Sequence, residues 1–249
     1  MLLANDKGNY HFWKGIAPYS GGVVAEKGYE IVHVRFAQPL RLAQGLARAQ
    51  AEVLAAGRPM HALCAMALRS PKPFTFPGFD EFNATYVKTL VAWGLLADGQ
   101  NPVARTNIAP EVLPPGEPSL YSFSYTVPSM TKARTFIVAG AGELPEGSLD
   151  PRDVVRRGEL SPDALREKIR FVMELMSGRL RGLGVGWDQV TTANVYTVHA
   201  ICAEVEKEIV TPMRAGAAHG FTWHYSRPPI ETIEYEMDLR GVRRESMLD

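Results

Sequence analysis

The histidine, cysteine and glycine residues of this sequence exclude several kinds of site. His219 and His224 would point to opposite faces of a strand, because side chains alternate along extended backbone, so they are not a pair of metal ligands. No other grouping of histidine, cysteine and carboxylate residues has metal-site spacing. The segment Gly140–Gly142 is a lone Gly-x-Gly without a phosphate-loop context. No serine or cysteine has the surroundings of a nucleophile elbow. We therefore expect neither a metal nor a serine or cysteine nucleophile.

The overall composition is that of an ordinary globular protein. Of the 249 residues, 46% are hydrophobic and 22% charged, and the 27 basic side chains equal the 27 acidic ones. A neutral chain has no broad field to attract nucleic acid or an anionic membrane, so we expect neither as a partner. Cys64 and Cys202 lack Cys-x-x-Cys spacing, and we expect buried thiols in a reducing compartment. The sequence has no signal-peptide pattern and no stretch of about 20 apolar residues, which predicts a cytoplasmic protein.

The pattern of strands and helices predicts the same order of elements twice. In the first half, the expected strands are 29–36, 61–68, 105–108 and 120–127, and the expected helices run from Pro39 to Gly57 and from a cap at Asp80 to Gly94. In the second half, the expected strands are 135–139, 190–198, 219–225 and 230–239, and the expected helices run from a cap at Ser161 to Gly184 and over 200–213.

This repetition indicates a duplicated supersecondary unit. It predicts an α+β fold of two tandem domains, residues 1–129 and 130–249, each a mixed sheet with two helices packed on one face. The uncovered face of each sheet must then be buried against another sheet, which predicts assembly of domains within or between chains.

Six short motifs, in order along the chain, resemble the YjgF/RidA family of reactive-intermediate deaminases. They are Ala17–Ser20, Phe82–Tyr86, Pro102–Thr106, Phe136–Gly140, Trp187–Tyr196 and Ile233–Glu236. The resemblance covers nearly the whole chain in two copies and implies YjgF/RidA-like (chorismate-mutase-like) domains. Because the family's domains form rings of three, it also implies a homo-oligomer, a trimer of two-domain chains.

The resemblance divides the family's site residues between the two halves. The first half keeps Tyr19, Asn83 and Arg105, where the family's arginine binds the substrate carboxylate and the other two would orient substrate or water. It has Tyr121 or a neighbour where the family has its catalytic glutamate. The second half keeps Gly140, whose backbone N–H would donate to the substrate.

The second half also keeps an acid, Glu234, but has His219 where the family has its arginine. The resemblance therefore implies one composite site at an interface between the halves. Glu234 would deprotonate a water or pass a proton to the departing amine. Glu236 shares its face at a spacing of two, so one of this pair is expected to be structural. His219 is expected to bind a second carboxylate, to act as an acid or base near neutral pH, or only to pack.

The resemblance implies a hydrolase that acts on C–N bonds, converting a small anionic enamine or imine to a keto or hydroxy acid plus ammonia. No cofactor is expected, because the C=N carbon is already electrophilic. The extra histidine favours a dicarboxylated substrate, 2-aminomuconate or a substituted 2-aminomuconate from aromatic catabolism. The alternatives are a general 2-aminoacrylate-type imine deaminase and a non-catalytic regulator that binds small carboxylates. A ribonuclease is disfavoured by the neutral charge.

Overall fold

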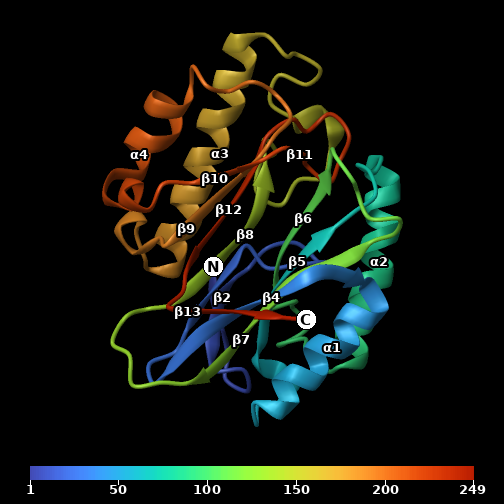
Figure 1. The fold of residues 1–249 in the computed structure, drawn as a ribbon, viewed down its shortest axis with the longest axis vertical. Coiled ribbons are helices and arrows are strands. Elements are labelled where there is room, and N and C mark those ends of the chain that lie inside the picture. Colours follow the sequence, from blue (N-terminus) through green and yellow to red (C-terminus); the bar gives the residue numbers. More distant parts are fainter.

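Two mixed β-sheets face each other in the middle of the molecule, and helices cover their outer faces (Figure 1). The computed structural model describes all residues from Met1 to Asp249. The front sheet has the strand order β11 (Ser226–Arg227), β6 (Ala104–Pro110), β5 (Leu63–Arg69), β7 (Ser119–Pro128), β4 (Tyr29–Arg41) and β13 (Arg244–Leu248). The rear sheet has the order β1 (Leu2–Asn5), β2 (Tyr10–Trp13), β3 (Gly22–Ala25), β8 (Phe136–Gly142), β12 (Glu236–Gly241), β9 (Thr192–Tyr196) and β10 (Thr222–His224).

Each sheet carries its helices on one face, as the pattern predicts. Apolar side chains of α1 (Leu42–Ala55) and α2 (Phe76–Ala92) pack on the front sheet. The long α3 (Pro162–Leu183) packs on the rear sheet beside the short α4 (Thr211–Met213). The remaining turns of helix are 3-10 segments at 60–62, 151–153, 187–189 and 214–219 and a π-helical segment at 205–210. The architecture is therefore α+β in four layers.

The two inner sheet faces bury each other within one chain. A cluster that includes Tyr10, Phe12, Ile31, Ala104 and Ala139 lies between the sheets, and none of these side chains is more than 1% exposed. The expected burial of the open sheet faces is thus met without a second chain. Further along the same interface the lining becomes polar, and a cleft remains there.

The ends of the chain cross between the sheets. Strands β1, β2 and β3 come from the first 25 residues, yet β3 pairs with β8 of the rear sheet. Strand β13, at the other end of the chain, pairs in parallel with β4 of the front sheet. The predicted boundary at 129/130 separates the two sequence repeats, whereas the sheets exchange strands across it.

Four predicted helix ends agree with the structure: the start at Ser161 and the ends at Gly57, Gly94 and Gly184. Ser161 Oγ accepts a hydrogen bond from the Ala164 N–H, 3.2 Å away, as a helix cap does. Gly57, Gly94 and Gly184 have φ values between 68° and 70°, a conformation that glycine adopts without steric cost.

Three predicted helix boundaries are wrong, and the strand expected over 230–239 begins only at Glu236. Residues 39–41 extend β4, because Leu40 and Arg41 still pair with β7, and the helix begins only at Leu42. The second helix begins at Phe76, where Thr75 caps the Gly78 N–H, so Asp80 lies inside it. The segment 200–213 ends in only three α-helical residues, because Pro212 has no N–H and fits only in a first turn.

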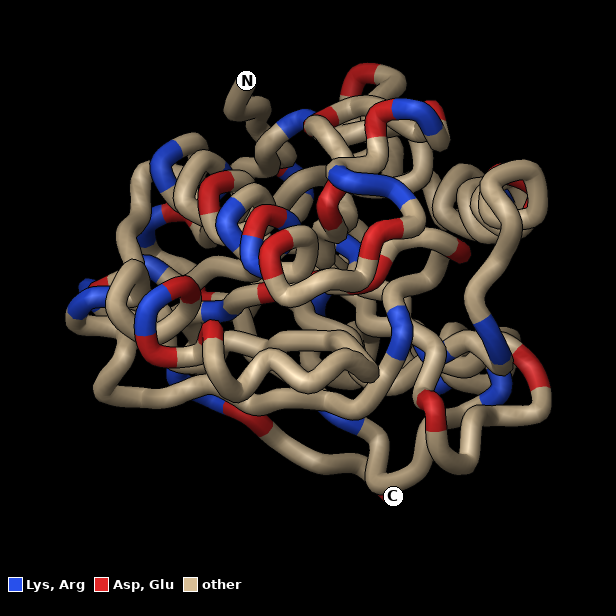
Figure 2. The backbone as a smooth tube through the Cα atoms, turned by 90° about the horizontal axis from the view of Figure 1, so that it is seen from above, with Lys and Arg blue, Asp and Glu red and all other residues tan.

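Some features differ from the expectations or had none. No strand was predicted for β1–β3, β11 or β13, and Cys202 is exposed where burial was expected. Acidic and basic residues interleave along the backbone in Figure 2, in keeping with the zero net charge. None of the helices is long and apolar enough to span a membrane.

The exchanged strands predict that the two sequence halves do not fold separately. Residues 1–129 alone would leave β3 without β8, and residues 130–249 alone would leave β13 without β4, so each piece would expose unpaired strand edges and apolar faces. Circular dichroism of each piece should show no cooperative thermal transition, and mixing both should restore one. Two separate cooperative transitions would instead establish independent domains.

Candidate active site

Arg105 is a buried guanidinium without a carboxylate partner. It lies on β6, is 3% exposed, and donates from Nη2 to Asn83 Oδ1 at 2.7 Å. Its Cζ lies 4.7 Å from the ring centre of Tyr19, 4.8 Å from that of Tyr86 and 5.5 Å from that of Phe79. Nη1 has no hydrogen-bond partner. Burial lowers the pKa of Arg105, and an unpaired buried N–H is costly, so this side chain is prepared for an anionic ligand.

Glu236 supplies a buried carboxyl group beside this arginine. It is the first residue of β12, is 4% exposed, and makes no ion pair. Burial raises the pKa of Glu236 well above its usual value of 4.5, and the negative charge of Asp238 raises it further. The positive charges of Arg179 and Arg105 act in the opposite direction without overcoming burial. A carboxyl group whose pKa is raised in this way keeps its proton to higher pH and can serve as a general acid.

These two side chains line one small cavity where β6 of the front sheet meets β8 of the rear sheet. The cavity has a volume of about 70 Å³. Its polar lining includes Tyr19, Arg105, Arg179, Glu236 and the backbone of Gly140, and we call it the Arg105 pocket. Any side chain at Gly140 would collide with the carboxylate of Glu236, so the glycine permits this close approach.

Arg179 fixes one wall of the Arg105 pocket from helix α3. Its Nη1 donates to the carbonyl oxygens of Ala139 at 2.9 Å and Gly140 at 3.3 Å. Its Nε donates to Glu146 at 2.6 Å. Because its charge is already paired with Glu146, Arg179 orients backbone and loop, whereas Arg105 keeps a free donor.

A fully buried ion pair sets the direction of the chain before Glu236. Lys168 Nζ lies 3.0 Å from Glu143 Oε1, and both side chains are 0% exposed. The same carboxylate accepts the backbone N–H of Glu234 at 2.7 Å and that of Tyr235 at 3.1 Å. These hydrogen bonds to Glu143 fix the backbone just before β12, so that the Glu236 side chain lines the Arg105 pocket.

The structure brings together four of the six predicted site residues. Tyr19, Arg105 and Gly140 line the Arg105 pocket, and Asn83 bonds directly to Arg105. Tyr121, the residue near the position of the missing glutamate, lies instead against Arg69, whose Cζ is 3.9 Å from its ring centre.

Glu234 and His219 lie elsewhere. Glu234 precedes β12 and binds His199 Nε2 at 2.7 Å, a contact that lowers the pKa of Glu234. His219 ends the 3-10 segment 214–219 and lines neither this pocket nor the cleft described next. The acidic side chain that lines the Arg105 pocket is therefore Glu236, whereas Glu234 lies outside it. The period-two pattern identifies the pair, but only the start of β12 at 236 decides which member faces the pocket.

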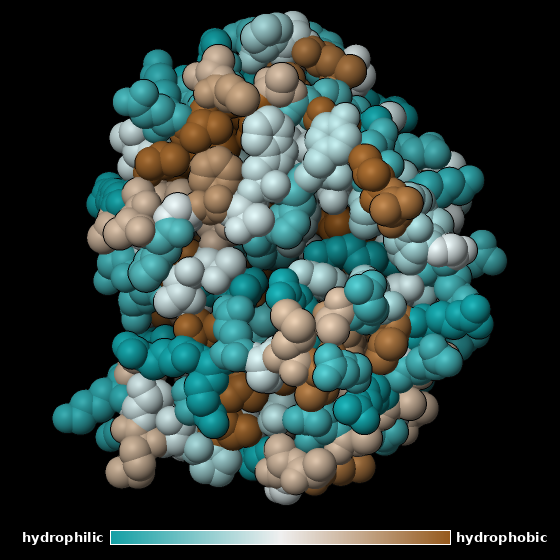
Figure 3. All heavy atoms as spheres, viewed as in Figure 1, coloured by the Kyte–Doolittle hydropathy of each residue, from teal (hydrophilic) through white to brown (hydrophobic).

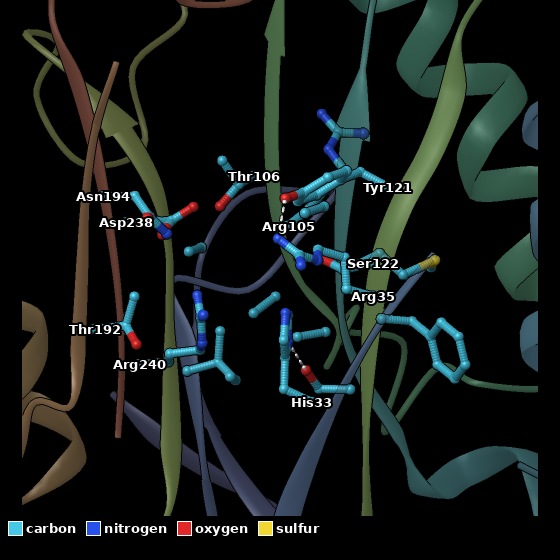
Figure 4. Close-up of a pocket in the computed structure, with 18 of the residues that line it drawn as sticks. His33, Arg35, Arg105, Thr106, Tyr121, Ser122, Thr192, Asn194, Asp238 and Arg240 are labelled. Atoms are coloured by element: carbon cyan, nitrogen blue, oxygen red, sulfur yellow. Dashed lines mark hydrogen bonds between the residues drawn. The ribbon is translucent and has the colours of Figure 1, made fainter. Parts of the chain in front are cut away.

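A larger cavity of about 360 Å³ lies between the two sheets, and we call it the intersheet cleft. In Figure 4, His33, Arg35, Tyr121 and Ser122 face Thr192, Asn194, Asp238 and Arg240 across it. On the molecular surface, hydrophilic residues gather across the middle of the face shown in Figure 3. Arg105 lines both cavities, and Gly140 of the pocket lies against Thr106 of the cleft. The two cavities are therefore neighbours.

The described residues include no group of three or more histidine, cysteine, aspartate or glutamate side chains placed to hold a metal ion. The fold and the Arg105 pocket thus define an α+β protein with a buried site suited to a small carboxylate.

Comparison with known proteins identifies the family. Residues 2–246 match the family model described as 2-aminomuconate deaminase CnbZ, and the chain belongs to this family. The 2-amino-5-chloromuconate deaminase of Comamonas testosteroni is 43% identical over 244 residues, which cover 97% of this chain and 96% of that protein.

Solved structures resemble the chain more distantly. A chorismatase is 12% identical, with a TM-score of 0.48, over 89% of this chain and 77% of its own. A putative endoribonuclease from Thermotoga maritima is 18% identical, with a TM-score of 0.30, over 55% of this chain and 92% of its own.

The raised pKa of Glu236 predicts how stability depends on pH. Between the usual pKa of 4.5 and the raised folded value, the folded protein binds more protons than the unfolded chain, so stability falls as pH rises. Glu236→Gln removes this proton uptake. The melting temperature of the variant, measured from pH 5 to 9, should fall less steeply with pH than that of the wild type. Parallel curves would show that Glu236 does not titrate abnormally.

Proposed function

We propose that this protein is a hydrolytic deaminase of 2-aminomuconate or a substituted 2-aminomuconate, and that the Arg105 pocket is its reaction site. The observation that carries the proposal is a buried guanidinium with a free N–H beside a buried carboxyl group of raised pKa. An enamine acid needs both an anchor for its carboxylate and a proton donor for its carbon. Membership of the 2-aminomuconate deaminase family and the 43% identical 2-amino-5-chloromuconate deaminase support this substrate class.

In the proposed reaction, Arg105 Nη1 binds the carboxylate next to the amino group with a charge-assisted hydrogen bond. Tyr19 and Asn83 hold the guanidinium in place, Tyr19 through its ring and Asn83 through its amide oxygen. Bound in this way, the reacting C–N carbon lies near Glu236 in the same pocket.

Glu236 then acts first as an acid and afterwards as a base. Its carboxyl group protonates the enamine carbon adjacent to the one that bears nitrogen, which turns the C–N bond into an iminium C=N bond. The resulting carboxylate takes a proton from the water that attacks the C=N carbon, and this proton then passes to the amine. The C–N bond breaks, ammonia leaves, and the keto or enol acid remains. Water supplies the new oxygen, so atoms and charge balance without an oxidant or reductant.

The wider expectations follow from the same proposal. We place the protein among hydrolases of C–N bonds, with a tandem YjgF/RidA-like organisation, a trimer of chains and a cytoplasmic location. The alternative of a non-catalytic carboxylate-binding protein would retain Arg105 without a usable acid. The position of Glu236 in the Arg105 pocket favours the enzyme over this alternative.

The test measures ammonia release and loss of the conjugated enamine's absorbance with freshly generated 2-aminomuconate. Glu236→Gln should lower kcat by about 10²–10⁴-fold, because it removes the proton donor. Arg105→Gln should lower kcat/KM by roughly 100-fold or more, because it removes a buried charge-assisted contact.

Glu234→Gln is the matched control. It alters a carboxylate two residues away that binds His199 outside the pocket, so its kcat should stay within about threefold of the wild type. Wild-type turnover by Glu236→Gln, or loss of turnover only in Glu234→Gln, would contradict the assignment of the acid. Absence of ammonia release by the wild type would refute the proposed function itself.

A further inference from the structure

The intersheet cleft contains a second buried guanidinium without a carboxylate partner. Arg69, the last residue of β5, is 6% exposed and takes part in no ion pair. One of its N–H groups donates to the carbonyl of Leu68 at 2.9 Å. Its planar group stacks on the ring of Tyr121 with 3.9 Å between Cζ and the ring centre. Stacking on the face of the guanidinium leaves the edge, where the N–H groups are, for a ligand.

The charges around the intersheet cleft favour a dianion. Four arginines and two carboxylates line it: Arg35, Arg69, Arg105, Arg240, Asp238 and Glu245. Burial lowers the pKa of His33 to about 4 and also lowers that of His224, so both imidazoles are neutral at pH 7. The lining therefore carries a net charge of +2 in a cavity of about 360 Å³. A small dicarboxylate would neutralise it.

The unpaired guanidinium of Arg69 lies near Tyr196, whose ring centre is 6.0 Å from the guanidinium carbon. The charge of Arg240 on β12 is already paired with Glu245 at 2.7 Å. Arg69 and Arg105, in contrast, have no carboxylate partner, and both line the cleft. A dicarboxylate would therefore place one carboxylate at each of these two arginines.

The polar groups on the rear-sheet side of the cleft are held in fixed orientations. Asp238 accepts hydrogen bonds from Asn194 Nδ2 at 2.8 Å and from Tyr196 Oη at 2.9 Å. His224 stacks on Tyr196 with 4.9 Å between ring centres and lies 3.2 Å from the Asn194 side-chain oxygen. Because these partners already satisfy Asp238, its charge does not compete for Arg69, and the guanidinium stays available.

We propose that the intersheet cleft binds a small linear dicarboxylate and that Arg69 recognises one of its two carboxylates. That this dicarboxylate is the enzyme's substrate rests on the proposed function; the binding itself does not. The cleft would then select molecules with a second carboxylate over molecules that have only one.

Two matched probes test this inference on the full-length protein. Muconate in its trans,trans form and sorbate share one diene skeleton, and sorbate has a methyl group where muconate has its second carboxylate. Calorimetric titration of the wild type should show tighter binding of muconate by roughly 30-fold or more, as a buried charge pair provides. Arg69→Gln should reduce this preference to about threefold or less, while the affinity for sorbate stays within about threefold.

A second variant keeps the test decisive if Arg69→Gln fails to fold. Arg35 is exposed and contacts the Tyr121 hydroxyl at 3.3 Å, so this position should tolerate substitution. Arg35→Gln should lower the preference for muconate by about threefold. Equal affinity of the wild type for both probes, or an unchanged preference in Arg69→Gln and Arg35→Gln, would overturn the inference. Muconate binding that depends on Arg69, in a protein that releases no ammonia, would uphold the inference while the proposed function fails.

Discussion

Every polar feature described here depends on two β-sheets that must bury their inner faces against each other. Over part of this interface the side chains are apolar and closely packed, with Tyr10, Phe12 and Ile31 almost without exposed surface. Over the rest, charged and hydroxyl side chains from both sheets face a cleft that the sheets cannot close, because these groups need polar partners. The dicarboxylate that we propose as a ligand would supply the complementary charge for that part of the interface. The apolar part provides the rigidity that keeps the polar part open.

The two unpaired arginines use the same physical principle in different settings. Arg105 is enclosed by aromatic rings and one amide, and Arg69 stacks on a single tyrosine. In both places aromatic faces support the guanidinium without neutralising it, which preserves the full charge for an incoming carboxylate. Paired arginines nearby, such as Arg179 with Glu146, hold the backbone instead. The paired arginines thus hold structure in place, whereas Arg105 and Arg69 have no carboxylate partner and remain the candidates for ligand binding.

Much of the fold follows from local sequence, and the missed parts depend on long-range pairing. Ser161 with Pro162 marks the start of α3, and the glycines after α1, α2 and α3 mark helix ends that local backbone preference alone determines. Strands β1–β3 and β13 carry no strong period of their own, and β3 and β13 pair with strands more than a hundred residues away. For the candidate site, the order of the motifs points to Arg105, Tyr19, Asn83 and Gly140. The alternation of side chains along a strand cannot decide which of two acids, Glu234 or Glu236, lines the pocket. The buried Lys168–Glu143 pair, remote in sequence, decides between them by fixing where β12 begins.

The strand exchange also bears on how the chain is made. The front sheet lacks its edge strand β13 until residue 248 has left the ribosome, and β3 waits for β8 through more than a hundred residues of synthesis. Folding of such distant pairings is slow compared with that of local helices, since the chain entropy of closing long loops must be lost first. The nascent protein therefore cannot complete its first half before its second, and a chain that ended before Arg244 would have an open sheet edge, a natural target for chaperones and proteases.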